Sequence, residues 1–100
     1  MTAYSFFDVL EIHDQEKMDE YVGRVEATVE QYQGRYVLIG GQWDVVEGTY
    51  QPVFPVIIEF PSLEQAHRWY DSEEYRDLKA LRLSAATSNA FFAEGFSEHA

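Results

Sequence analysis

The chain has 100 residues, with 18 acidic and 7 basic side chains, a net charge of −11 and no cysteine. These values exclude a disulfide framework, a thiolate nucleophile and a cysteine-based metal site, and they oppose binding to nucleic acid, which needs clustered Lys and Arg. With 46% hydrophobic residues, one domain that buries about two-thirds of its surface can fill a core. No apolar run could span a membrane and no signal peptide is visible, so we expect a cytoplasmic α+β domain.

The first 34 residues predict a strand followed by a helix. Residues 3–11 carry β-forming side chains in a short run, and Asp14 can cap the helix that comes next. From Met18 to Tyr32 apolar side chains recur at spacings of three and four, which is typical of an amphipathic helix. Gly34 follows the last of them, where we expect the left-handed residue that often ends a helix.

The middle of the chain predicts two further strands. Residues 35–47 read as one bent strand, interrupted by a bulge at Gly40 and Gly41. A turn over 48–52 leads to the most apolar strand, at 53–60. Pro55 cannot donate a hydrogen bond to a sheet, so we expect it at an end of that strand or at a bulge.

The last third predicts a broken helix and a final strand. Ser62 with Gln65 three residues later forms a capping box at the start of the helix. Asp71 with Glu74 repeats this signal, so we expect the helix to break and restart there. Residues 89–96 then predict the last strand.

The resulting order, β-α-β-β-α-β, indicates the ferredoxin-like fold of the α+β class. Two split β-α-β units with right-handed crossovers give a four-stranded antiparallel sheet with the helices on one face. The first strand should lie between the third and the last. We expect one domain at 1–96 and a polar tail at 97–100.

The face of the sheet away from the helices is also predicted to be apolar. Phe6 and Phe7 are adjacent and must point to opposite faces, and so must Phe91 and Phe92. An exposed apolar face of this size is unusual for a monomer. We therefore expect a homodimer in which two copies pack sheet to sheet. The alternative is that the bent strand and the tail cover the face.

A set of motifs around the second helix resembles a known family. The motifs are Glu59-Phe60-Pro61-Ser62, Trp69-Tyr70-Asp71-Ser72, Glu74-Tyr75 and Leu78-Lys79-Ala80-Leu81-Arg82. With them the chain is similar, from about Tyr4 to Gly95, to the domain of unknown function 1330 family. The resemblance implies the dimeric α/β barrel superfamily, whose members include cofactor-free monooxygenases, muconolactone-type isomerases and haem peroxidases. Fold analogy does not choose among these activities.

Four residues of this region are candidates for binding a substrate. Arg82 lies on the same helical stripe as buried residues, so its guanidinium can hold a ligand carboxylate. The alternative is a structural ion pair with Glu59, Glu94 or Asp8. Trp69, Tyr70 and Tyr75 can line a pocket between helix and sheet, or they can simply be core residues.

Two residues are candidates for proton transfer. Asp8 lies in an apolar strand, where burial would raise its pKa and suit it to act as an acid or base. An ion pair with Arg35 or Arg82, or a position facing water, would also explain it. His67 precedes Asp71 by four residues and could be an oriented base, or a histidine on the helix surface.

Together these residues favour a cofactor-free isomerase or monooxygenase that acts on a small aromatic or carboxylated metabolite. The alternative is a non-catalytic homodimer with a small-ligand-binding or structural role. We expect no cofactor and no metal, because the three histidines lack ligand spacing. The expected partners are a second copy of the chain and a small molecule, and neither nucleic acid nor a membrane.

Overall fold

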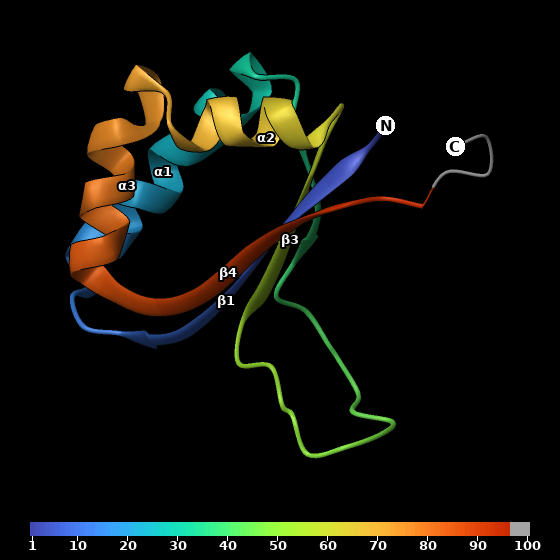
Figure 1. The fold of residues 1–100 in the computed structure, drawn as a ribbon. Helices are drawn as coiled ribbons and strands as arrows, with labels where there is room; N and C mark the ends of the chain where they lie inside the picture. The colour runs from blue at the N-terminus through green and yellow to red at the C-terminus, as the bar shows by residue number, and fades with distance from the viewer. Residues whose placement is uncertain (97–100) are drawn as a thin grey trace.

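The structure, a computed structural model, describes residues 1–96, so the predicted tail at 97–100 lies outside the described residues. Along the chain the elements follow the order β-α-β-β-α-α-β (Figure 1). They are β1 (Ala3–Ile12), α1 (Gln15–Gln31), β2 (Arg35–Ile39), β3 (Pro55–Phe60), α2 (Leu63–Tyr70), α3 (Glu73–Ala85) and β4 (Ala86–Glu94). None of the described helices has both the length and the apolar character needed to cross a membrane.

The strands form one antiparallel sheet in the order β2-β3-β1-β4, with all the helices on one side (Figure 1). This confirms the predicted ferredoxin-like fold and the position of the first strand between the third and the last. At the centre of the sheet, Phe6 of β1 lies opposite Ile57 of β3 and Phe91 of β4. The predicted second helix is divided into α2 and α3.

The second half of the predicted bent strand is wrong. β2 ends at Ile39, and residues 40–54 leave the sheet as a long segment that projects away from the rest of the molecule (Figure 1). We call this segment the arm. Gly40 and Gly41 have φ angles of 56° and 78°, in the left-handed region that other residues avoid, and they turn the chain out of the sheet. β3 then begins only at Pro55, a first strand position where the missing N–H is tolerated.

The predicted helix caps are largely confirmed. The Asp14 side chain accepts a hydrogen bond from the Lys17 N–H at 3.1 Å. Ser62 caps α2, but Ser72 rather than Asp71 caps α3. The Ser72 side chain accepts the Tyr75 N–H, whereas Asp71 is the C-cap of α2.

The end of α1 differs from the prediction in one residue. The left-handed position is Gln33, with a φ of 61°, and Gly34 comes after it. Gly34 is required for packing instead, since a Cβ there would lie 2.6 Å from a Phe60 ring carbon and 2.7 Å from Val29. Close approach of α1 to β3 therefore selects glycine at this position.

The last strand also starts earlier than predicted. β4 begins at Ala86, directly after α3, and ends at Glu94, whereas the prediction placed it at 89–96. Pairing with the whole length of β1 extends it toward α3.

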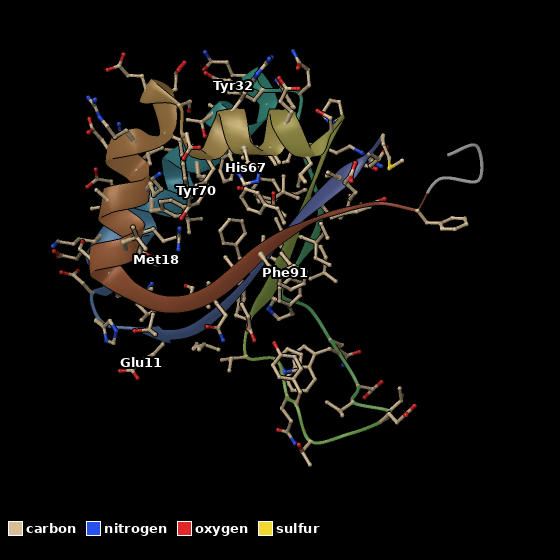
Figure 2. The ribbon with its side chains drawn as sticks, in the orientation of Figure 1. Glu11, Met18, Tyr32, His67, Tyr70 and Phe91 are labelled. Atoms are coloured by element: carbon tan, nitrogen blue, oxygen red, sulfur yellow. The ribbon has the colours of Figure 1, made fainter. Side chains whose placement is uncertain are left out.

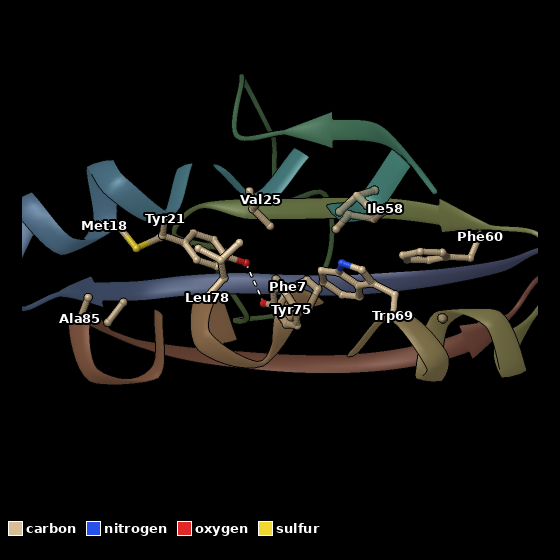
Figure 3. Close-up of a cluster of buried hydrophobic side chains, with 13 residues drawn as sticks. Phe7, Met18, Tyr21, Val25, Ile58, Phe60, Trp69, Tyr75, Leu78 and Ala85 are labelled. Carbon is tan, nitrogen blue, oxygen red and sulfur yellow. Dashed lines mark hydrogen bonds between the residues drawn. The ribbon is translucent and has the colours of Figure 1, made fainter. Parts of the chain in front are cut away.

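An aromatic cluster forms the centre of the core between helices and sheet (Figure 3). Trp69 and Tyr75 are completely buried, and their ring centroids lie 4.2 Å apart. Phe60 of β3 lies 5.5 Å from Trp69, and the indole N–H donates to Thr28 Oγ1 at 3.0 Å. The buried indole is therefore both packed and hydrogen-bonded.

The opposite face of the sheet is apolar, as the doubly apolar strands predict. Phe6 and Phe91 stack there with ring centroids 5.0 Å apart, and 59% of Phe91 is exposed. Phe91 lies on the side of the strands away from the helices (Figure 2). This face carries a row of apolar side chains with no helix over it.

Candidate ligand-binding cavity

A cavity of about 590 Å³ lies between α1 and the sheet, on the helix-covered side. Its walls are mostly apolar and come from α1, from β1, β2 and β3, from the end of the arm and, at Arg82, from α3. The main lining residues are Val9, Met18, Tyr21, Val25, Tyr36, Phe54 and Ile58. A cavity of this size and character is typical of sites for small molecules.

Arg82 brings a positive charge to the wall of this cavity. It lies in the last turn of α3 and is only 4% exposed. Its Nε donates to the hydroxyl of Tyr75 at 3.3 Å, and its guanidinium carbon lies 5.2 Å from the centre of the Phe7 ring. Among residues 1–96, no Asp or Glu forms an ion pair with Arg82.

The structural ion pair considered for Arg82 is therefore not observed within the described part of the chain. Glu59 instead pairs with Arg35 on the other face of the sheet. Asp8 accepts its hydrogen bonds from the arm, and Glu94 is exposed at the end of β4. The three carboxylates considered for Arg82 are thus hydrogen-bonded to other groups or exposed elsewhere. Glu11 and Glu26 also line the cavity, but neither forms an ion pair with Arg82.

Two tyrosines connect Arg82 to α1, and Figure 3 shows the hydrogen bond between them. The hydroxyls of Tyr21 and Tyr75 are hydrogen-bonded at 2.7 Å. Burial raises the pKa of Tyr75, although the charge of Arg82 opposes this, and burial together with Tyr75 raises the pKa of Tyr21 well above its usual value. Both phenols are therefore neutral near pH 7, and they do not compensate the charge of the guanidinium.

The electrostatics of the cavity follow from these contacts. Burial opposes the charged form of Arg82, but its tyrosine neighbours keep the pKa above the ordinary arginine value. A buried charge without a partner lowers the stability of the folded protein by roughly several kcal/mol, unless an opposite charge lies beside it. A ligand carboxylate or another planar anion can supply that charge through a bidentate contact.

Four predicted substrate-binding residues lie close together, but only Arg82 lines the cavity. Tyr75 contacts Arg82 and Tyr21 through its hydroxyl, at the border of the cavity. Trp69 and Tyr70 belong to the aromatic cluster, with the Tyr70 ring 5.9 Å from that of Tyr75. Their predicted ligand contacts remain predictions.

Asp8 lies on the face of the sheet opposite the cavity and is completely buried beneath the arm. Its Oδ2 accepts the Tyr50 hydroxyl at 2.8 Å, and its Oδ1 accepts the N–H groups of Val53 and Phe54 at 3.0 and 2.8 Å. Burial raises the pKa of Asp8, but these three hydrogen bonds outweigh it and lower the pKa below its usual value. This is the opposite of the raised pKa expected from the sequence.

His67 lies on α2 and is exposed, with its ring 5.0 Å from that of Phe92 (Figure 2). It borders a shallow depression that also includes Asp71, not the cavity beside Arg82. The structure does not bring His67 and Asp8 together, since the sheet separates them. Their proton-transfer roles stay predictions.

Tyr21 and Tyr36 line the cavity but were not among the predicted site residues. Tyr21 lies on the apolar stripe of α1, at the same helical spacing as the core side chains, so its position does not distinguish it from them. Tyr36 lines the cavity from β2, and burial raises its pKa strongly. The only available signal was the polar atom on each of these otherwise apolar positions.

Several solved structures share this fold. A protein of unknown function from Rhodopseudomonas palustris is 16% identical, with a TM-score of 0.73 over 96% of this chain and 83% of that chain. A dimeric ferredoxin-like protein of unknown function from Jannaschia sp. CCS1 is 7% identical, with a TM-score of 0.68 over 95% and 100%. A cofactor-independent oxygenase from Streptomyces nogalater is 11% identical, with a TM-score of 0.61 over 96% and 92%.

At these identities the likeness shows the fold alone. No curated protein matches the chain. A family model described as Domain of unknown function (DUF1330) matches residues 2–96, almost the whole sequence. The chain therefore belongs to the domain of unknown function 1330 family.

Proposed function

We propose that this protein binds a small, largely apolar carboxylic acid in the cavity between α1 and the sheet, with the carboxylate on Arg82. The observation that carries the proposal is a buried guanidinium that lines an apolar cavity and pairs with no carboxylate among the described residues. Buried arginines are usually paired, so this one is suited to a charge brought by a ligand. The apolar walls favour an aromatic or branched body on the acid.

A second candidate function is cofactor-free isomerisation or oxygenation of the bound acid. Arg82 and the Tyr75 hydroxyl lie beside each other and can both stabilise negative charge that develops on a substrate oxygen. A cofactor-independent oxygenase of similar fold supports this second candidate. Binding is the primary proposal, because neither Asp8 nor His67 lines the cavity.

We also propose that two copies associate through the open face of the sheet. The stacked Phe6 and Phe91 lie there without a covering helix, and neighbours of the same fold are described as dimeric. Light scattering should give twice the 11.6 kDa mass of one chain. Phe91→Glu should halve that mass, while Leu83→Glu, at an equally exposed apolar position on α3, should not. A wild-type mass of 11.6 kDa would contradict the association.

The ligand proposal is tested with naphthoate and its neutral counterpart naphthamide, which have the same ring system. Naphthoate should raise the thermal midpoint of the wild-type protein, because a ligand that binds only the folded state stabilises it. Naphthamide should raise it much less. Arg82→Met should remove the difference between the two compounds, and Arg82→Lys should restore part of it.

Equal shifts by both compounds in the wild type would show that Arg82 does not recognise a charge. An undiminished preference for naphthoate in Arg82→Met would place the carboxylate elsewhere. For the second candidate, turnover of a bound acid without added cofactor should fall in both Arg82→Met and Tyr75→Phe. Turnover unchanged in both variants would contradict the role given to this pair.

A further inference from the structure

The arm (residues 40–54) contributes part of the cavity wall. Val53 and Phe54, at the end of the arm, line the cavity, as does Ile39 immediately before it. Val53 is 54% exposed and Phe54 45% exposed, so both lie where the cavity meets solvent. The shape of the cavity opening therefore depends on where this segment is held.

Asp8 makes most of the hydrogen bonds that hold this segment. One carboxylate accepts three donors from it, the hydroxyl of Tyr50 and the backbone N–H groups of Val53 and Phe54. Every residue from 41 to 51 is exposed, whereas Asp8 is completely buried. A buried carboxylate whose side-chain hydrogen bonds all come from one external segment fixes the position of that segment strongly.

The remaining attachments lie at the two ends of the arm. The Gly40 N–H donates to Pro55 O at 2.7 Å, and the Val9 N–H donates to Phe54 O at 3.1 Å. The Phe54 ring also packs where a Cβ of Gly40 would be, at 2.6 Å. Within residues 1–96 these are the other hydrogen bonds that reach the arm, so Tyr50 and the Val53 N–H depend on Asp8.

We propose that Asp8 is a positioning residue for the ligand cavity: from the opposite face of the sheet it holds Val53 and Phe54 so that they enclose the apolar body of the ligand. This inference rests on the proposed ligand-binding function. It assigns recognition of the two parts of the ligand to different residues. Arg82 recognises the charge of the acid, and Asp8, through the arm, sets the affinity for its apolar body.

The division of roles predicts distinct effects of the two residues. Asp8→Ala leaves the Val53 and Phe54 N–H groups without an acceptor, so the end of the arm loosens. Naphthoate and naphthamide should then both bind about tenfold more weakly, by the same factor, because the lost contacts are apolar. Benzoate, whose single ring reaches fewer wall residues, should lose less.

Amide hydrogen exchange tests the anchoring without any ligand. In Asp8→Ala the Val53 and Phe54 amides should exchange at least about tenfold faster than in the wild type. Tyr50→Phe removes only the hydroxyl contact and should have a smaller effect on both exchange and affinity. Asp8→Asn keeps an oxygen acceptor for the two N–H groups and should restore most of the protection. Asp44→Ala removes an exposed carboxylate from the same arm and should change neither measurement.

The outcomes separate this inference from the function on which it rests. Unchanged exchange of Val53 and Phe54 in a folded Asp8→Ala protein would overturn the anchoring. Faster exchange with unchanged naphthoate affinity would overturn the link to the cavity. If Asp8→Ala does not fold, the graded effects of Tyr50→Phe and Asp8→Asn decide the same question. Failure of naphthoate to bind the wild type would overturn the proposed function, while exchange would still report on Asp8.

Discussion

The space between the helices and the sheet has two halves that are built differently. Beneath α2, Phe60, Trp69 and Tyr75 fill it with aromatic rings at centroid distances of 4.2 and 5.5 Å. Beneath α1, the same two layers leave a cavity of about 590 Å³ with Arg82 on its wall. Because the same sheet and helices enclose a filled half and a hollow half, the fold by itself does not require a cavity.

The two halves also differ in whether their buried polar groups have partners. In the filled half, the buried Trp69 N–H has a partner in Thr28, as buried donors normally do. In the open half, the Arg82 guanidinium has one phenol contact and no carboxylate among residues 1–96. A cavity that coincides with a buried charge lacking a carboxylate partner is typical of functional sites.

The largest expected effect is in the filled half. Trp69→Ala removes a completely buried indole and should lower the free energy of unfolding by about 3–5 kcal/mol, measured by urea denaturation. The control is Trp43→Ala in the arm, which removes a 40% exposed indole and should change the free energy by less than about 1 kcal/mol. Similar losses in the two variants would mean that the aromatic cluster is not the main source of stability.

A matched pair of valines on α1 compares the halves directly. Val29 is completely buried outside the cavity, and Val25 lines it. Val29→Ala should cost about 2 kcal/mol of unfolding free energy, because it creates a new void among packed atoms. Val25→Ala should cost no more than about 1 kcal/mol, because that side chain already faces empty space. Equal costs would indicate that the cavity is closed in solution.

High pH should lower the stability of the protein through Tyr21 and Tyr75, which lie between the two halves. Burial raises the pKa of Tyr21 and of Tyr75, so the folded state holds their protons above pH 10, where unfolded tyrosines release theirs. Stability should therefore be complete below about pH 10 and fall as the pH rises further. Urea midpoints between pH 8 and pH 11.5, about the range of tyrosine ionisation, measure this. Tyr21→Phe should flatten the decline, and an unchanged slope would remove Tyr21 from the explanation.

The smallest expected effect on stability is at Arg82. Arg82→Met replaces a buried charge that lacks a carboxylate partner by an apolar side chain of similar length, so the free energy of unfolding should change by less than about 1 kcal/mol or increase. Urea denaturation of the ligand-free protein measures it. A loss of about 3 kcal/mol or more would show that Arg82 belongs to the structural core after all.

Local sequence patterns were sufficient for the order of helices and strands, the caps at Asp14 and Ser62, and the break between α2 and α3. They also placed Arg82 inside, since its helical stripe is apolar, and showed that Phe6 and Phe7 make both sheet faces apolar. Each of these features depends on residues a few positions apart, where periodicity and capping chemistry act.

Only the tertiary structure decided the arm, the partners of Asp8 and the cavity. Asp8 meets Tyr50 and Phe54 across more than forty residues of chain, so its lowered pKa could not be seen in its own strand. Whether a carboxylate lies beside Arg82 likewise depends on the positions of all the acidic side chains in the folded protein. A cavity is space that no side chain enters, and it exists only once all elements have packed. The sequence by itself therefore determined the fold and the inward position of Arg82. Long-range packing created the cavity beside this charge, and with it the candidate binding site.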